Sequence, residues 1–100
     1  MSAAQPLPMS PGAILWVGID WSRWLGSAGI ASQVVSVPTG ITKLDEEVSG
    51  TVTRARVQLD PAAATDGSVT LEVAFSVTTN EAKPQTDTRY FVIRPQHRTV

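Results

Sequence analysis

The sequence predicts an all-β fold: a small antiparallel β-sandwich of the immunoglobulin-like kind with one short helical turn. Five or six short segments have the period-2 pattern or β-prone composition of strands, and turn residues separate them. No segment has the length and period of a long helix. One hundred residues, of which 42% are hydrophobic, suffice for one domain with a small core.

The chain begins with a segment that we expect to lie outside the core. Residues 1–12 contain three prolines, which remove amide donors and favour extended backbone. We interpret this segment as an extended N-terminal arm, which is either a disordered tail or a segment that orders on a neighbouring subunit. The β-sandwich domain is then expected over residues 13–95, and a mostly polar C-terminal tail over residues 96–100.

Three strands are expected in the first half of the domain. Both alternating sets of side chains in residues 13–19 are apolar, which indicates a strand covered on both faces. Residues 30–37 form the second strand, which ends at turn residues 38–40. Residues 41–48 suit either a helical turn or an irregular edge strand. We expect a solvated edge, because Asp45, Glu46 and Glu47 are adjacent and discourage pairing between sheets.

The second half contains the clearest alternation. The strand over residues 51–59 directs Thr53, Ala55, Val57 and Leu59 to one face. The strand over residues 68–78 has five period-2 matches, which leave little room for a helix. Its inward set is Val69, Leu71, Val73, Phe75 and Val77. The last strand, residues 87–94, places Tyr90 and Val92 opposite Phe91 and Ile93.

The segment Asp20-Trp21-Ser22-Arg23-Trp24-Leu25 predicts the helical turn. Asp20 is a candidate N-cap and Gly26 a candidate stop. Trp21, Trp24 and Leu25 share one face of such a turn. This apolar face is either a lid over one end of the core or an anchor into a partner protein, since tryptophan is favoured at interface hot spots. We favour the lid.

Composition excludes several classes of protein. The chain has no cysteine, so it has no disulfide framework and no cysteine-based zinc site. The formal charge of −1 gives no basic surplus for nucleic acid or an anionic membrane. No apolar stretch is long enough to span a membrane, and the N-terminal residues lack the features of a signal peptide. We therefore expect a product of the cytoplasm.

No group of residues predicts catalysis, a cofactor or a metal site. The one histidine, His97, is in the expected tail, where nothing would hold it as a base. Arg54, Arg56 and Arg89 form either a small positive patch or, as we expect, ion pairs with carboxylates such as Glu72. Because no nucleophile, base and oxyanion hole come together, we expect that the protein is not an enzyme.

Several short segments, taken in order, resemble a known family. They are Asp20-Trp21-Ser22-x-Trp24-Leu25, Gly29-Ile30-Ala31, Val37-Pro38-x-Gly40-Ile41, Val77-Thr78-Thr79-Asn80 and Thr86-Asp87-x-Arg89-x-Phe91-x-Ile93-Arg94. Their order and spacing, over residues 14–95, are similar to those of the fibre–tail adaptors of tailed phages. Two features depart from that pattern: residues 81–85 replace a short glycine-containing loop, and residues 1–12 are an addition.

The resemblance implies a bacteriophage virion structural protein, a small β-sandwich that joins tail and tail fibres by protein–protein packing. It implies partners among tail, fibre or collar subunits, multiple copies in a symmetric assembly, and a virion location after synthesis in the host cytoplasm. The alternatives are another virion joint, at the collar or between head and tail, and an immunoglobulin-like module that binds a ligand such as a glycan. An exposed aromatic ring would favour the glycan module. The candidate structural or interface residues are Asp20, Trp21, Trp24, Leu25, Arg89, Phe91 and Ile93.

Overall fold

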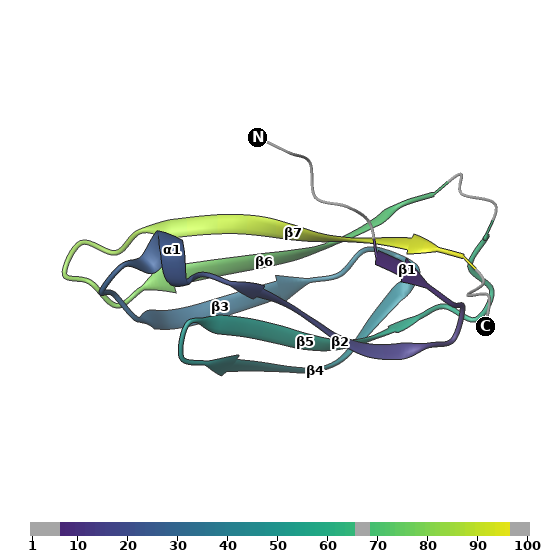
Figure 1. Cartoon of the computed structure of the whole chain (residues 1–100), viewed down its shortest axis with the longest axis horizontal. Helices are drawn as coiled ribbons and strands as arrows, with labels where there is room; N and C mark the ends of the chain where they lie inside the picture. Colours follow the sequence, from purple (N-terminus) through teal and green to yellow (C-terminus); the bar gives the residue numbers. More distant parts are fainter. Residues whose placement is uncertain (1–6, 66–68, 97–100) are drawn as a thin grey trace.

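Two β-sheets pack face to face in the computed structural model, which describes residues 7–65 and 69–96 (Figure 1). The larger sheet has the strand order β1-β7-β6-β3 and the smaller sheet the order β2-β5-β4. The elements in chain order are β1 (Leu7–Met9), β2 (Ile14–Asp20), α1 (Ser22–Leu25), β3 (Ile30–Ser36), β4 (Ile41–Ser49), β5 (Val52–Leu59), β6 (Leu71–Thr79) and β7 (Thr86–Pro95). The prediction of a small all-β sandwich with one helical turn is confirmed.

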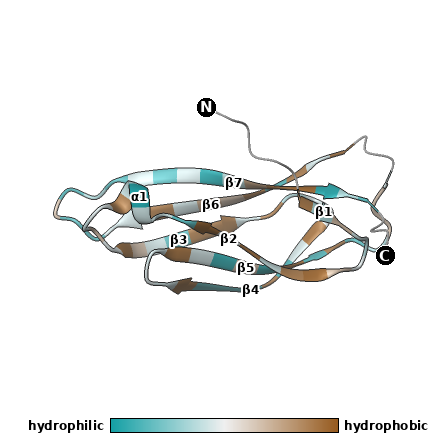
Figure 2. Ribbon diagram, viewed as in Figure 1, coloured by the Kyte–Doolittle hydropathy of each residue, from teal (hydrophilic) through white to brown (hydrophobic). Residues whose placement is uncertain are grey.

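The core lies between the sheets and follows the predicted alternation. Strands β5 and β6 supply the largest share of it, since nearly every second residue of these strands is buried. Figure 2 shows the same alternation as brown and pale bands along β6, while β7 is teal and white beside α1, brown along its middle and teal again at its end beside β1. The fully buried members from these two strands are Thr53, Ala55, Val57, Leu59, Val73, Phe75 and Val77.

The expectation that residues 1–12 lie outside the core is wrong for residues 7–9. Leu7–Met9 form β1, which pairs with the end of β7 in parallel, Leu7 opposite Ile93 and Met9 opposite Pro95. Met9 is fully buried in the core. A proline is tolerated in β1 because β1 is the outermost strand of its sheet. Residues 1–6 of the expected arm lie outside the described residues.

Two predicted inward assignments in the strands are also wrong. Strand β2 is not covered on both faces: Ile14 and Trp16 are 43% and 46% exposed, because none of the described elements forms a third layer over the smaller sheet. Val69 precedes β6 and is exposed rather than buried. The solvated edge at residues 41–48 is confirmed as β4, whose register with β5 shifts between Lys43 and Asp45.

The connections divide between the two ends of the sandwich. One end carries the turns from β2 through α1 to β3, from β4 to β5 and from β6 to β7 (Figure 1). The opposite end carries β1 and the connections from β3 to β4 and from β5 to β6. Of the expected tail, only Gln96 is described, and its backbone N–H donates to the Met9 carbonyl at 3.0 Å. His97 lies outside the described residues.

Candidate interface surfaces

The helical turn α1 closes the end of the sandwich at which β2 finishes. Asp20 stands one residue before the N-cap position, which Trp21 occupies without a side-chain cap, so the predicted N-cap assignment is wrong by one residue. The Asp20 carboxylate nevertheless accepts a hydrogen bond from the Ser22 backbone N–H at 2.9 Å and one from the Thr51 hydroxyl at 3.4 Å. The predicted stop is observed, because Gly26 ends the helix with a φ of 61°.

Hydrogen bonding changes the titration of Asp20. The Ser22 backbone N–H, then the Ser22 hydroxyl and more weakly the Thr51 hydroxyl stabilise the ionised carboxylate. These donors lower the pKa of Asp20 below its usual value. Asp20 is therefore an ionised side chain that ties the end of β2 to the first turn of α1.

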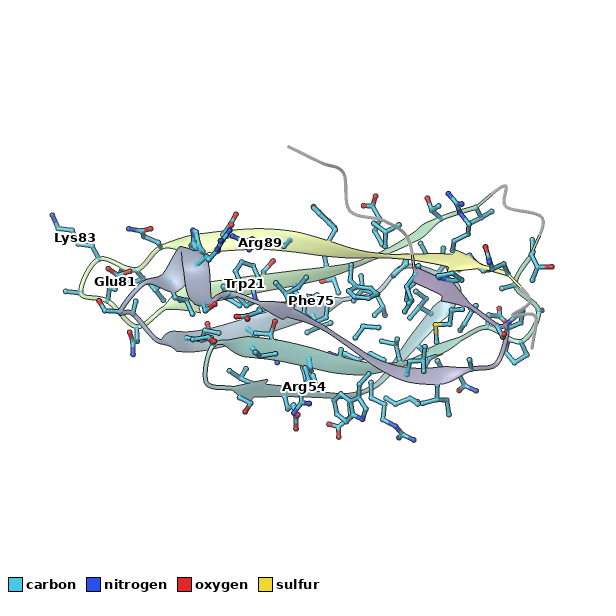
Figure 3. All side chains as sticks on the ribbon, in the orientation of Figure 1. Trp21, Arg54, Phe75, Glu81, Lys83 and Arg89 are labelled. Carbon is cyan, nitrogen blue, oxygen red and sulfur yellow. The ribbon has the colours of Figure 1, made fainter. Side chains whose placement is uncertain are left out.

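Trp21 contacts both sheets, and we name its surroundings the tryptophan end. Its side chain is fully buried, and its Nε1–H donates to the hydroxyl of buried Thr53 on β5 at 2.9 Å. The Arg89 guanidinium of β7 lies 4.8 Å from the Trp21 ring centroid (Figure 3). Trp24 meets the Trp21 ring edge-on, with centroids 5.5 Å apart and an interplanar angle of 62°.

The structure separates the predicted site residues into two groups. Five of them surround the tryptophan end: Asp20, Trp21, Trp24, Leu25 and Arg89. Trp21 and Leu25 are buried within their own chain, whereas Trp24 is half-buried, so this geometry supports the lid rather than an anchor. The other two, Phe91 and Ile93, belong to the core farther along β7, where Ile93 is fully buried and Phe91 is half-buried.

The outer surface of the smaller sheet carries a feature that the sequence reasoning missed. We name it the Trp16 face and define it by Ile14, Trp16, Gly18, Arg54 and Arg56. These residues are register partners or neighbours on the outward side of β2 and β5. The sequence does contain a signal of this exposed face. Strand β2 alternates between two apolar sets of side chains, and only one set can face the core of a two-layer fold, so the other must face solvent or a partner.

Close contacts hold Arg54 in place on the Trp16 face. A Cβ at Gly18 would lie 2.6 Å from the Thr53 carbonyl oxygen and 2.9 Å from the Arg54 Cγ, so only glycine leaves room for the arginine stem. The Arg54 guanidinium lies 5.7 Å from the Trp16 ring centroid and pairs with Glu47 of β4. Arg56, directly opposite Trp16, forms no ion pair with a described residue.

The outer surface of the larger sheet is chemically different. We name it the hydroxyl face and define it by Ser32, Val34, Ser76, Thr78, Thr88 and Tyr90, which the strand registers place on its outward side. Side-chain hydrogen bonds join Ser76 to Thr88 at 2.7 Å and Thr78 to Thr86 at 3.1 Å. Val34 is 62% exposed and Tyr90 53% exposed, and this group of residues carries no charge.

The other ion pairs join side chains of the same strand, and the surface has a shallow depression among the described residues. Lys43 binds Glu46 at 3.0 Å on β4, and Arg89 lies 3.6 Å from Asp87 on β7. The predicted partner of the arginines, Glu72, is not used by Arg54 or Arg89, which have Glu47 and Asp87 instead. A shallow depression at the β1 end is lined by Gly40, Ile41, Thr42, Gln58, Asp60 and Pro61. The Asp60 carboxylate in this depression accepts a hydrogen bond from the Ala62 backbone N–H at 2.9 Å.

The described residues, 7–65 and 69–96, lack two kinds of feature that would indicate another class of site. They contain no group of three or more His, Cys, Asp or Glu side chains suited to a metal ion. None of the helices in this part of the chain has the length and apolar character needed to cross a membrane.

Comparison with known proteins identifies the family. A family model described as podophage GP4 fiber-tail adaptor protein gp77 matches residues 9–94. The match covers most of the chain, so the chain belongs to this family, as its resemblance to fibre–tail adaptors predicted. It begins at the fully buried Met9 of β1 and ends within β7, and therefore takes in both sheets. No curated protein and no solved structure matches the chain.

Proposed function

We propose that this member of the podophage fibre–tail adaptor family is a virion structural protein that joins the tail to the tail fibres by protein–protein packing. The family supports a role in the phage tail, and the two outer faces support the packing. In this proposal the protein acts through its surfaces and performs no catalysis. Its partners are other virion proteins, and neither nucleic acid nor a membrane is required.

The observation that carries the proposal is the contrast between the Trp16 face and the hydroxyl face. A protein that joins two different neighbours needs two surfaces that are not interchangeable. The Trp16 face combines a half-exposed indole with two arginines, and tryptophan and arginine are enriched at interface hot spots. The hydroxyl face instead presents uncharged side chains around Tyr90, and loss of charge with gain of aromatics marks the centre of an interface.

The tryptophan end has a supporting role in the proposal. Trp21, Trp24, Leu25 and Arg89 close the sandwich between the two faces and hold the sheets in their relative positions. Phe91 and Ile93 support the larger sheet from inside. These residues act on assembly through the stability of the domain, and the partners contact the exposed faces instead.

A phage that cannot make this protein tests the proposal. We expect particles that have tails but lack fibres, seen by negative-stain electron microscopy, and recovery of fibres when the purified protein is added. Particles without tails would place the protein at the head–tail joint, and particles with normal fibres would contradict an adaptor role. Trp16→Glu and Tyr90→Glu, each on a folded protein, are expected to weaken binding to different partners, measured with purified tail and fibre proteins.

The glycan-binding alternative receives support from one observation. Trp16 and Tyr90 are both about half exposed, and an exposed ring is the platform that a sugar needs. However, the Arg54 guanidinium already lies near the Trp16 ring, which leaves less of that ring for a ligand. Binding to a glycan array that Trp16→Ala abolishes would favour this module over the adaptor.

A further inference from the structure

Strand β3 is an edge strand without the charged side chains that usually protect an edge. It pairs only with β6, so one side of it is unpaired by any other strand of its sheet. Residues 24–42, which include all of β3, contain no charged side chain. The edge strand β4 is different, since it carries four charged residues. Both edge strands have a shift in register, which in β3 lies at its first residues, between Ile30 and Ser32. Uncharged edges without proline are the sites at which another strand adds.

The hydrogen-bonding pattern shows which groups of β3 face the free side. The Thr79 N–H donates to the Gln85 carbonyl, so odd-numbered residues of β6 bond toward β7 and even-numbered residues toward β3. Ser76 and Thr78 of β6 therefore bond to Val34 and Ser32. The main-chain groups of Gln33 and Val35 consequently point to the unpaired edge.

Gln33 is the middle residue of β3 and has a second unusual property. It lies opposite Val77 on the inner side of the sheet, and its side-chain oxygen is buried without a hydrogen-bond donor among the described residues. A buried amide oxygen without a donor is costly, so native proteins usually satisfy it. A donor supplied from the free edge would remove this cost.

We propose that two copies of this chain pair through β3, antiparallel and around a two-fold axis centred on Gln33. This inference goes beyond the proposed function and does not depend on it. Antiparallel partners share a sheet face, so inward residues must oppose inward residues. Centring the pair on Gln33 meets this condition for Ser32, Gln33 and Val34, which lie beyond the register shift that β3 has between Ile30 and Ser32. It joins the two four-stranded sheets into one continuous sheet.

The register supplies hydrogen-bond partners to Gln33 at the unpaired edge of each copy. Gln33 lies directly opposite Gln33 of the second copy, and two opposed amides can each donate to the oxygen of the other. The main-chain N–H and C=O of Gln33 bond to those of Gln33 in the second copy. On the outer side, Ser32 opposes Val34 of the second copy. A second copy is favoured over another protein because Ser32, Gln33 and Val34 complement the same three residues of a second copy about Gln33.

The first test places like charges across the proposed pair. Ser32→Lys with Val34→Lys puts lysine directly opposite lysine in the pair, while both positions are exposed in the single chain. We expect the wild-type protein to sediment as a dimer at tens of micromolar, and the double variant as a folded monomer, checked by circular dichroism. The matched control is Thr88→Lys with Tyr90→Lys, which adds the same charge to the same sheet two strands away from the edge.

The control distinguishes edge pairing from packing through the hydroxyl face. We expect it to remain dimeric, and a control that dissociates as fully as the edge variant would overturn pairing through β3. A monomeric wild-type protein would also overturn the proposal. Protection of β3 amides from hydrogen exchange only in the presence of a purified tail or fibre protein would assign the edge to that partner instead. None of these three results bears on whether particles without the protein lack fibres.

The second test uses the absence of cysteine from the chain. Ser32→Cys with Val34→Cys places each new thiol opposite one on the second copy, at a non-hydrogen-bonded position where Cα atoms are about 4.5 Å apart. This separation is within the roughly 4.4–6.8 Å range of disulfides. Mild oxidation is expected to give a covalent dimer, whereas Thr88→Cys with Tyr90→Cys gives little. Equal cross-linking of the two variants would contradict the register.

Discussion

Trp16 and Trp21 lie five residues apart in the chain and have opposite environments. Trp21 is fully buried and donates its indole N–H to Thr53, while Trp16 is 46% exposed beside Arg54 and Arg56. The difference comes from where each residue stands on β2. Trp16 is on the outward side of an edge strand, and Trp21 follows the end of that strand, where the chain turns into α1 and crosses toward β7. Residue type alone does not decide whether an indole serves the core or the surface.

The comparison also separates stability from binding. A buried indole that touches both sheets affects whether the domain exists, whereas an exposed one affects what the domain can contact. The same substitution can therefore be made at both tryptophans. The Trp21 variant should lose stability, whereas the Trp16 variant should lose binding to a partner. The predictions below apply this contrast from the largest expected effect to the smallest.

Trp21→Ala is expected to produce the largest loss of stability. It removes a fully buried indole and leaves the Thr53 hydroxyl without its donor, so the free energy of unfolding should fall by about 3–5 kcal/mol. Denaturant unfolding followed by circular dichroism measures the change. The matched control is Trp16→Ala, which should lower stability by less than about 1 kcal/mol because half of that side chain is already in water. Similar losses for the two variants would contradict the contrast.

Met9→Ala is expected to cost about 2–4 kcal/mol of unfolding free energy, because Met9 is fully buried although it lies in a proline-rich segment. Its neighbour Pro8 is exposed on the opposite side of β1, so Pro8→Ala is the control and should have little effect. Thermal melts of the two variants check the difference. A Met9→Ala protein that melts like the wild type would support the sequence-based prediction that residues 7–9 belong to an arm outside the core.

Trp24→Ala is expected to have an intermediate effect. Trp24 is half-buried and contributes an edge-on contact to Trp21, so its loss should cost about 1–2 kcal/mol, clearly less than Trp21→Ala. Trp24→Phe keeps an aromatic ring at the contact and should recover part of the loss. A cost for Trp24→Ala equal to that for Trp21→Ala would show that the two indoles act as one plug.

The sequence was sufficient for the fold class and for most of the core. Alternation in β5 and β6 placed Thr53, Val57, Val73 and Phe75 correctly, because these central strands have one face on the core and period 2 is then unambiguous. It was insufficient for β2, where both sets of side chains are apolar. Pattern alone cannot state which set faces the core, and the choice depends on the other sheet.

The predictions of the N-terminal arm and of the interface residues were incomplete for related reasons. A high proline content means that the segment has few amide donors. An outermost strand pairs on one side only and therefore needs fewer donors, so β1 forms despite Pro8. Motif spacing selected Trp21, Arg89 and Ile93, which the structure shows to be inward-facing residues. The exposed residues available to partners, such as Trp16 and Tyr90, are revealed by the strand order rather than by local sequence.

The smallest expected effect concerns Asp20, which lies between the two tryptophans. Donation by Ser22, with a lesser contribution from Thr51, lowers the pKa of the folded-state carboxyl below its unfolded value. At pH values near and below about 4 the unfolded chain therefore binds more protons at this position, and the contribution of Asp20 to stability is lost as the pH falls. It is fully present above that range. The effect is small because the carboxylate is exposed to solvent.

Asp20→Asn isolates this contribution, since asparagine can still accept the Ser22 N–H but does not titrate. The other carboxylates are common to both proteins, so the difference between their denaturation midpoints at pH 6, 4 and 3 reports Asp20 alone. Wild type should be the more stable protein at pH 6, and its advantage should shrink by pH 3. A difference that stays constant across these pH values would mean that the hydrogen bonds at the start of α1 do not favour the ionised carboxylate. The turn that buries Trp21 would then be held by packing and by the hydrogen bonds of Trp21, with no contribution from the charge of Asp20.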